Sequence, residues 1–359
     1  MSFDILDNLA TARPDRLDPP GRPPLILDSA GTRRARPRLF VAAGALVTAA
    51  AGVVAVALAV SGSSTPAPAP AAPEPATAGQ LLLAAAEHSE AVAPATGGRY
   101  LVVGSESGWT VPTDGGYQVV EKELSQYWFA RSDADKSWVV VEPLGAAPAS
   151  AADRAAWAAH GSPAVVHVTA PKPFDLSVAA PGKRYGNVID PQHLFALGDL
   201  NVSQTELDAL PTEPAALRNA LLKRYRGGGS DMPTDRNEWL FSVTSSVLMD
   251  LPVSRAVRGA AYHVLAGLPG VRALGTVTDQ RGRSGQAVAT TERQAGQGTF
   301  EVRLIFDPNT GAPLAREYRA VAPAGRLAWL KAGQLSSYAL VLAPEATDDN
   351  PPAVITPSR

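Results

Sequence analysis

The chain has 359 residues, of which 45% are hydrophobic and 18% are charged, with no cysteine and a net charge of −2. The absence of cysteine excludes disulfides, cysteine-ligated zinc, iron–sulfur clusters and thiol catalysis. A net charge this close to zero argues against a general nucleic-acid binder, and the hydrophobic fraction is too high for a wholly disordered chain.

Residues 1–38 and 39–60 differ sharply in composition. The first segment contains seven arginines, five aspartates and six prolines, and we predict that it is a short, mostly disordered tail. The second reads LFVAAGALVTAAAGVVAVALAV and has 22 residues without a charge. As a helix it would extend roughly 33 Å, enough to cross a hydrocarbon core of about 30 Å. We therefore predict one transmembrane helix over 39–60.

The charges that flank this segment predict its orientation. Four arginines lie within residues 33–38, whereas the first charge after the segment is Glu74. The positive-inside rule then places the tail 1–38 in the cytoplasm and the C-terminal part outside the cell membrane. A cleaved signal peptide is the alternative, with Ala57-Leu58-Ala59 as a small-x-small site. The apolar run is, however, longer than the typical 7–15 residues of a signal peptide. Both interpretations export the C-terminal part.

Two further segments read as linkers. Residues 61–78 include TPAPAPAAPEPATA, in which eleven of fourteen residues are proline or alanine, and this composition predicts a semi-rigid spacer. The end of the chain, 344–359, contains paired aspartates and paired prolines and is predicted to be a disordered tail. The folded domain should therefore span 79–343.

The first part of this domain predicts one helix and an antiparallel meander. A helical pattern covers 80–91. Runs rich in β-branched and aromatic residues then follow at 100–111, 117–130 and 137–142, separated by turn residues. Residues 143–190 show little periodicity, apart from a short helix predicted at 151–159.

The centre of the domain predicts helices with recognisable caps. Ser203 and Glu206 have the spacing of a capping box, and Pro214 suits the first turn of a helix that continues to Tyr225. Apolar residues at helical spacing continue from Leu240 to Leu251, and Ser254 can cap one further helix.

The period then returns to two residues, which predicts a second set of strands. Their ranges are 271–278, 286–293, 300–306, 314–321 and 335–342. Links of hairpin length favour antiparallel pairing. The predicted fold class is therefore α+β, a curved antiparallel sheet with helices packed on one face. Such a sheet either fills its concave side with side chains or leaves a hydrophobic cavity.

Three segments carry a resemblance to a known family. They are LPTEPAALRNALLKRY at 210–225, the helix–LPGV–strand–D-x-x-GR-x-G pattern within 252–285, and FDPNTGAPLAREY at 306–318. The chain resembles an uncharacterised actinobacterial family of single-pass membrane proteins that are named by locus tags. The resemblance implies that the protein acts in a pathway with extracytoplasmic-function sigma factors. The layout is also similar, at the level of fold, to the half-barrel of lipoprotein carriers and periplasmic sigma-pathway sensors.

No motif in the sequence predicts catalysis. Gly104-Ser105-Glu106-Ser107-Gly108 lacks the spacing of a nucleophile elbow, and the five histidines do not form a metal-binding pattern. The glycine runs are not followed by Lys-Ser or Lys-Thr, as a phosphate-binding loop would require. We therefore expect no catalytic residue, no cofactor, no metal and no enzyme activity.

Two groups of residues are candidates for contact with a ligand or a partner. Tyr127, Trp128 and Trp138 lie in the aromatic-rich first strands, where the simpler interpretation is core filling. Arg281 and Arg283 lie in a polar glycine-containing turn, where the simpler interpretation is an ordinary hairpin turn.

The sequence thus predicts a membrane-anchored, non-enzymatic module outside the cell. Our first hypothesis is a sensor or accessory module of an envelope or sigma-factor pathway that binds a protein partner or an apolar ligand. The alternative is a carrier-like binder of lipid or another hydrophobic ligand. An exported hydrolase is the weakest hypothesis, because no acid–base–nucleophile set is visible.

Overall fold

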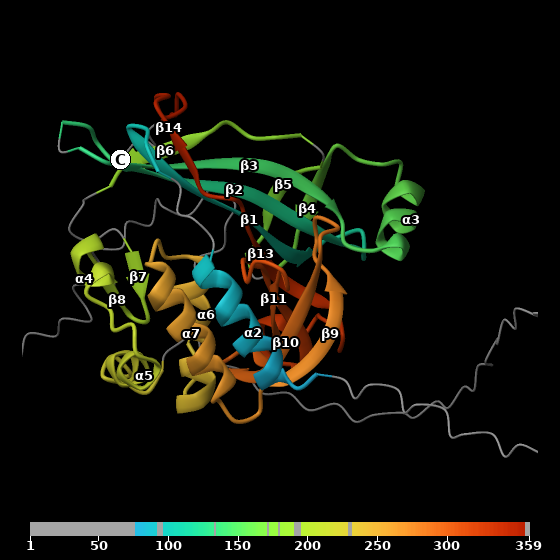
Figure 1. Ribbon diagram of the computed structural model, residues 1–359. Coiled ribbons are helices and arrows are strands. Elements are labelled where there is room, and N and C mark those ends of the chain that lie inside the picture. The colour runs from blue at the N-terminus through green and yellow to red at the C-terminus, as the bar shows by residue number, and fades with distance from the viewer. Residues whose placement is uncertain are drawn as a thin grey trace, which may run out of the picture. The chain divides into compact units, whose positions relative to one another are not determined.

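A computed structural model describes residues 76–91, 96–132, 134–170, 172–178, 180–189, 195–228 and 232–355 (Figure 1). The predicted tail 1–38, the predicted transmembrane segment 39–60 and most of the linker 61–78 lie outside these residues. Across the described ranges, no helix combines the length and the apolar character needed to cross a membrane.

A sheet of ten strands forms the centre of the domain. Its order is β6-β3-β2-β1-β13-β12-β11-β10-β9, and β14 pairs with β1 beside β13. The strands are β1 (Tyr100–Pro112), β2 (Gln118–Ala130), β3 (Trp138–Pro148), β6 (Tyr185–Val188), β9 (Arg272–Thr278), β10 (Ser284–Gln294), β11 (Gly298–Phe306), β12 (Pro313–Pro323), β13 (Leu335–Val341) and β14 (Glu345–Thr347). All these strand pairs are antiparallel, which confirms the predicted α+β class with an antiparallel sheet.

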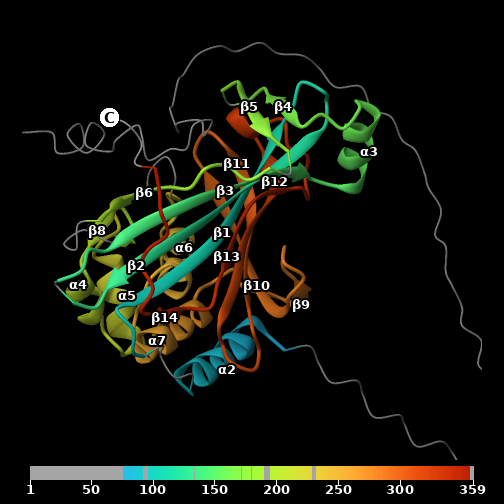
Figure 2. The same ribbon diagram turned by 90° about the horizontal axis from the view of Figure 1, so that it is seen from above.

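The position of β13 joins the two predicted sets of strands. Its residues pair with β1 on one side, with Leu340 opposite Glu106, and with β12 on the other, with Leu340 opposite Ala315. Figure 2 shows β1 and β13 side by side along the length of the sheet. The N-terminal meander β1–β3 and the C-terminal meander β9–β12 are therefore parts of one sheet.

The helices predicted from capping patterns begin where those patterns place them, whereas the first helix begins two residues before the predicted range 80–91 and the helix predicted from Leu240 begins at Arg236. They are α2 (Ala78–Ala91), α3 (Ala151–Ala159), α4 (Gln204–Asp208), α5 (Pro214–Leu222), α6 (Arg236–Met249) and α7 (Arg255–Ala266). Ser203 and Glu206 form the capping box of α4, and the hydroxyl oxygen of Ser254 accepts from the backbone amide of Val257 in α7. Helix α5 ends at Leu222, three residues before the predicted end at Tyr225.

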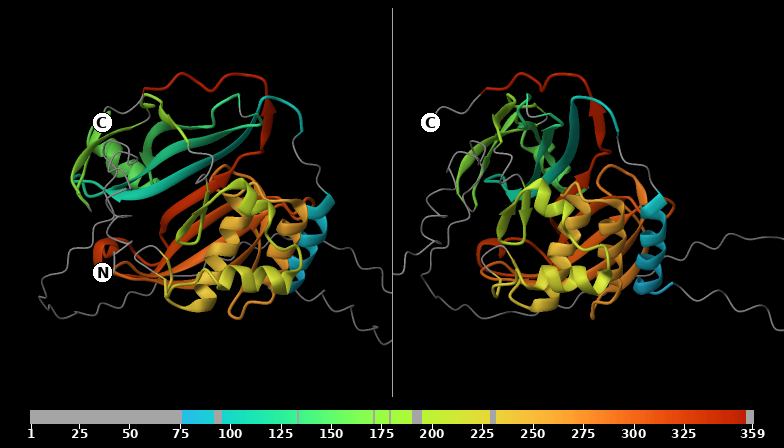
Figure 3. Two further views of the ribbon diagram at one scale, coloured as in Figure 1. Left: turned by 90° about the vertical axis from the view of Figure 1, so that its left-hand side faces the viewer. Right: turned by 60° about the vertical axis from the view of Figure 1, so that its left-hand side comes forward.

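Helices α2, α6 and α7 cover one face of the C-terminal strands. Helix α6 contacts β10 and β12, α2 contacts β9, and α7 packs against α2, α5 and α6. The main hydrophobic core lies in this layer, where Val302 and Leu304 of β11 and Leu240 of α6 are fully buried. Figure 3 shows these helices in front of the C-terminal strands, while the green strands of the first meander extend past them.

Three short strands occur in the region 143–190 that showed little periodicity, and two more follow it before α4. Strands β4 (Val165–Val168) and β5 (Phe174–Ser177) form one hairpin, β7 (Phe195–Leu197) and β8 (Leu200–Val202) form another, and β6 joins the edge of the large sheet. Strands of three or four residues contain too few alternations to give a periodic signal. Strand β14 lies in the predicted tail 344–359 and pairs through its backbone, which the side-chain pattern does not reveal.

Glu292 of β10 is a buried acid beneath the helical layer. Its residue is 0% exposed, and among the described residues neither carboxylate oxygen forms an ion pair or a well-aligned hydrogen bond, although the Gln294 side chain lies nearby. Burial raises the pKa of Glu292 to about 8, and the charge of Glu238 adds to the rise, whereas Arg316 opposes it. The carboxyl is therefore protonated in the folded protein at pH 7.

This burial predicts a pH-dependent stability. The folded-state pKa of Glu292, about 8, lies above its ordinary value of 4.5, so folding takes up a proton between these pH values. The free energy of unfolding should then fall as pH rises through this window, by at most about 1.4 kcal/mol per pH unit. Urea unfolding of the full-length protein from pH 5 to pH 8 measures it. Glu292→Gln should flatten the dependence, whereas the exposed Glu87→Gln should leave it unchanged; equal slopes in both variants would contradict the assignment.

Candidate functional site

In the described part of the chain, α2, α6 and α7 make no extensive contact with β1–β3 of the large sheet. We call the helix-facing side of β1–β3, at the end that the hairpin β4–β5 does not cover, the open face. Val103, Tyr127 and Val139 lie directly opposite one another across the three strands. The open face consists of Leu101, Val103, Tyr127, Phe129, Val139 and Val141.

The two sides of this meander differ in burial. Where helices cover a sheet, the helix-facing side is the more buried one, but here the open face is the more exposed one. On the side away from the helices Tyr100, Val102 and Val140 are buried, whereas the apolar side chains of the open face are half-buried or exposed. The hairpin β4–β5 covers Val111 and Val119, which lie on the helix-facing side at the far end of these strands. The six apolar residues of the open face therefore keep contact with water that ordinary core residues do not.

Tyr127 is the most exposed residue of the open face. It is 37% exposed, and its ring stacks on Phe129 with centroids 5.9 Å apart and an interplanar angle of 12°. Phe129 in turn contacts Phe195 of β7 at 4.9 Å. The pKa of the Tyr127 hydroxyl is raised, first because the surrounding chain removes water and then because Asp250 and Glu123 are negatively charged. The hydroxyl is therefore a neutral hydrogen-bond donor within a largely apolar surface.

Trp128 and Trp138 lie on the opposite side of the same strands. They face each other across β2 and β3, and Trp128 meets the ring of Tyr100 edge-on at 5.9 Å. Trp128 is 7% exposed and belongs to a small core cluster that Trp138 packs against. Among the described residues, the indole nitrogen of Trp128 has no hydrogen-bond partner. The pleat thus separates these two predicted site residues from Tyr127.

Arg283 is anchored inside the hairpin turn between β9 and β10. Its guanidinium lies 2.7 Å from the carboxylate of Asp279, whose side chain is 0% exposed. It also donates to the carbonyls of Val341 at 2.9 Å and Leu314 at 2.8 Å. The left-handed backbone of Gly282, with φ of 80°, makes this tight turn possible.

Arg281 reaches from the same turn to β1. Its guanidinium donates to the carboxylate of Glu106 at 2.7 and 2.9 Å, and the hydroxyl of Tyr338 donates to the other carboxylate oxygen at 3.0 Å. The ring of Tyr338 lies against Gly108, where any Cβ would overlap it. Both predicted site arginines are therefore bound within the chain, away from the open face. Contact of Arg281 or Arg283 with a partner stays a prediction.

The described residues include no group of three or more His, Asp or Glu side chains that could hold a metal ion. His193 lies outside the described residues. His88 lies 2.6 Å from the carbonyl oxygen of Pro308, and His167 lies 2.9 Å from the carboxylate of Asp175.

Sequence reasoning found one residue of the open face and missed the others. Tyr127 was singled out for its aromatic ring, whereas Val103 and Val139 looked like ordinary strand residues. Alternation placed each valine on one side of its strand, but only the position of the helical layer shows which side is open. Local sequence does not encode that position.

No family model matches the chain, and a search of curated proteins found no match. Among solved structures, the MucA/MucB complex of Pseudomonas aeruginosa is similar at 14% identity, with a TM-score of 0.24 over 75% of this chain. The match covers 58% of that chain, less than two thirds of its length. A LolA superfamily protein of Nitrosomonas europaea is similar at 10% identity, with a TM-score of 0.16 over 77% of this chain and 96% of its own.

The two arginines of the turn predict unequal losses of stability. Arg283→Gln leaves the buried carboxylate of Asp279 without its ion pair, which should lower the free energy of unfolding by about 3 kcal/mol. Arg281→Gln removes a more exposed pair, in which the Arg281 side chain is 42% exposed, and should cost about 1 kcal/mol or less. Urea unfolding of the full-length variants measures both values. A larger loss for Arg281→Gln would show that the buried carboxylate does not dominate this turn.

Proposed function

We propose that the described domain is a non-enzymatic binding module that holds a segment of a partner protein on its open face. In this proposal it serves as a sensor or accessory module of an envelope or sigma-factor pathway, in keeping with the family that the sequence resembles. The observation that carries the binding role is the row Val103–Tyr127–Val139, an apolar strip across three strands that the helices leave uncovered.

The chemistry of the open face suits a polypeptide. Apolar area removed from water contributes roughly 25 cal/mol per Å², so covering several half-buried valine, leucine and aromatic side chains is favourable. The next row along the strands contains the hydroxyl groups of Ser105 and Ser125. An apolar strip beside polar side chains matches the pattern of a protein interface, in which an apolar core is bordered by a polar rim.

Carrier-like binding of a lipid is the alternative, and the packing beneath the helices weakens it. A carrier of this layout encloses its ligand between the sheet and the helices. In this domain that space contains the main core, where Val288, Val302 and Leu304 are 0% exposed. The filled core favours a ligand on the open face over one enclosed beneath α6 and α7.

We also propose that the module is held outside the cell membrane by the segment 39–60 and the spacer 61–78. The arginines before the apolar segment and the absence of charge from 39 to 73 support this orientation. A module tethered in this way would meet partners that are themselves membrane-anchored or exported.

The topology has a direct test. Topology reporters can be fused at residue 30 and at residue 100. Only the second should lie outside the cell membrane, because the arginine cluster at 33–38 holds the N-terminus in the cytoplasm. Both reporters on the cytoplasmic side would refute the topology. A mature chain that begins after Ala59 would show that the apolar segment is a cleaved signal peptide.

The open face can be tested by site-specific photo-crosslinking in cells. Benzoylphenylalanine in place of Val139 should give a discrete crosslinked protein, because this position is half-buried in the open face. The matched control is Val188 on β6, which is 47% exposed and lies on the other side of the same meander, opposite Trp138. Tyr127→Ser should reduce the crosslink from position 139 at least several-fold, with unchanged protein abundance.

The adduct decides between the two functions. A partner polypeptide from position 139, identified by mass spectrometry and absent from position 188, supports the proposal. A lipid adduct at position 139 would support the carrier alternative. Equal crosslinks from both positions would refute the open face as a specific site.

A further inference from the structure

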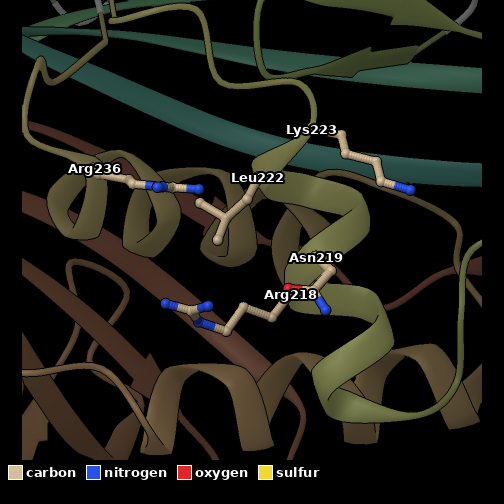
Figure 4. A pocket seen from close by; sticks show the side chains of 5 residues that line it. All are labelled: Arg218, Asn219, Leu222, Lys223 and Arg236. Carbon is tan, nitrogen blue, oxygen red and sulfur yellow. The ribbon is translucent and has the colours of Figure 1, made fainter.

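A pocket separate from the open face lies between α5 and the first turn of α6. It has a volume of about 490 Å³ and is lined by Arg218, Asn219, Leu222, Lys223 and Arg236. In Figure 4 the guanidinium groups of Arg218 and Arg236 lie on one side of Leu222, and the Lys223 side chain extends on the other. The pocket thus combines an apolar floor with three positive charges.

These charges are not neutralised within the described part of the chain. None of the three cationic side chains forms an ion pair there. The neighbouring carboxylates bind backbone amides instead. Glu213 accepts from Ala215 and Ala216 at 3.0 and 2.7 Å, and Asp235 accepts from the first turn of α6 at 2.8 and 3.0 Å.

Helix electrostatics explain only part of this cluster. Lys223 follows the last turn of α5, where a positive charge is favourable, and Arg226 donates to the carbonyl of Lys223 at 2.6 Å. Arg236 is the first residue of α6, where a positive charge opposes the helix dipole. Its position therefore does not serve the stability of its own helix.

We propose that this pocket binds an anion that carries a phosphate group. Two guanidinium groups on the same side of the floor can form paired hydrogen bonds to phosphate oxygens, and three positive charges suit a phosphate monoanion or dianion. Asn219 adds a neutral donor, and Leu222 offers apolar contact to whatever the phosphate is attached to. A small phosphorylated metabolite and a phospholipid headgroup present the same chemistry to this pocket.

The test measures binding to the full-length protein in uncharged detergent by isothermal titration calorimetry at constant ionic strength. The probes are inorganic phosphate and dihexanoylphosphatidylglycerol, with dihexanoylphosphatidylcholine as the zwitterionic comparison. The double variant Arg218→Gln/Arg236→Gln should weaken binding at least tenfold. Arg154→Gln is the matched control, because it removes one exposed arginine from α3, which lies far from α5 in Figures 1 and 2.

Each outcome is decisive. Phosphate binding that the double variant loses and Arg154→Gln keeps supports a small-molecule phosphate site, and the same pattern with phosphatidylglycerol alone supports a lipid headgroup site. No binding of either probe, or equal binding by the double variant, overturns the proposal. If the double variant does not fold, as judged by circular dichroism, Arg236→Gln and Arg236→Lys replace it; the lysine variant should bind more weakly than the unchanged protein and more tightly than the glutamine variant. None of these results bears on the open face, which shares no residue with this pocket.

Discussion

The pairing of β13 between β1 and β12 is the constraint on which the rest of the structure depends. Without it, the meanders β1–β3 and β9–β12 would be two separate sheets. The hairpin turn between β9 and β10 reinforces the same junction, because Arg283 donates to the carbonyl of Val341 in β13 and Arg281 binds Glu106 in β1. The junction joins residues more than 200 positions apart, as between Glu106 and Leu340. Non-local pairings of this kind are intrinsically slow to form, because the entropy of closing a long loop opposes them.

The width of this joined sheet explains why one face stays open. Nine neighbouring strands of the sheet, about 4.8 Å apart, extend over roughly 38 Å. Helices packed side by side are about 10 Å apart, so α2, α6 and α7 cannot cover the whole width. They cover the C-terminal strands, to which α7 connects directly through β9. The first meander therefore keeps apolar side chains on a part of this face that α2, α6 and α7 do not cover, and Tyr127 and Val139 lie there. Helix α3 and strand β5 contact β3 at its other end.

The long elements could be predicted from the sequence, and their arrangement could not. Runs of β-branched and aromatic residues indicated β1 and β2, and alternation over 300–306 indicated β11. Ser203 and Ser254 marked the starts of α4 and α7. All these signals are local. The insertion of β13 depends on backbone bonds between distant segments. For the same reason Tyr127 could be singled out while the open face could not. The pocket brings together Arg218 of α5 and Arg236 of α6, and the pattern within either helix does not show that the two residues are neighbours.

Helix α6 connects the two proposed sites. It begins at Arg236 in the cationic pocket. Asp250, which follows its last residue, helps to raise the pKa of Tyr127 in the open face. The fourteen residues of the helix place its two ends about 21 Å apart. This helix is buried on nearly all sides, and Arg316 of β12 holds its last turn through Ser246 at 3.1 Å and Asp250 at 3.3 Å. Glu238 holds its first turn by accepting from the backbone amide of Arg293 at 2.8 Å. A shift of α6 along its axis would break both attachments, so they hold the helix in one position. We therefore expect the two sites to bind independently, unless a ligand displaces Arg316 from the end of α6.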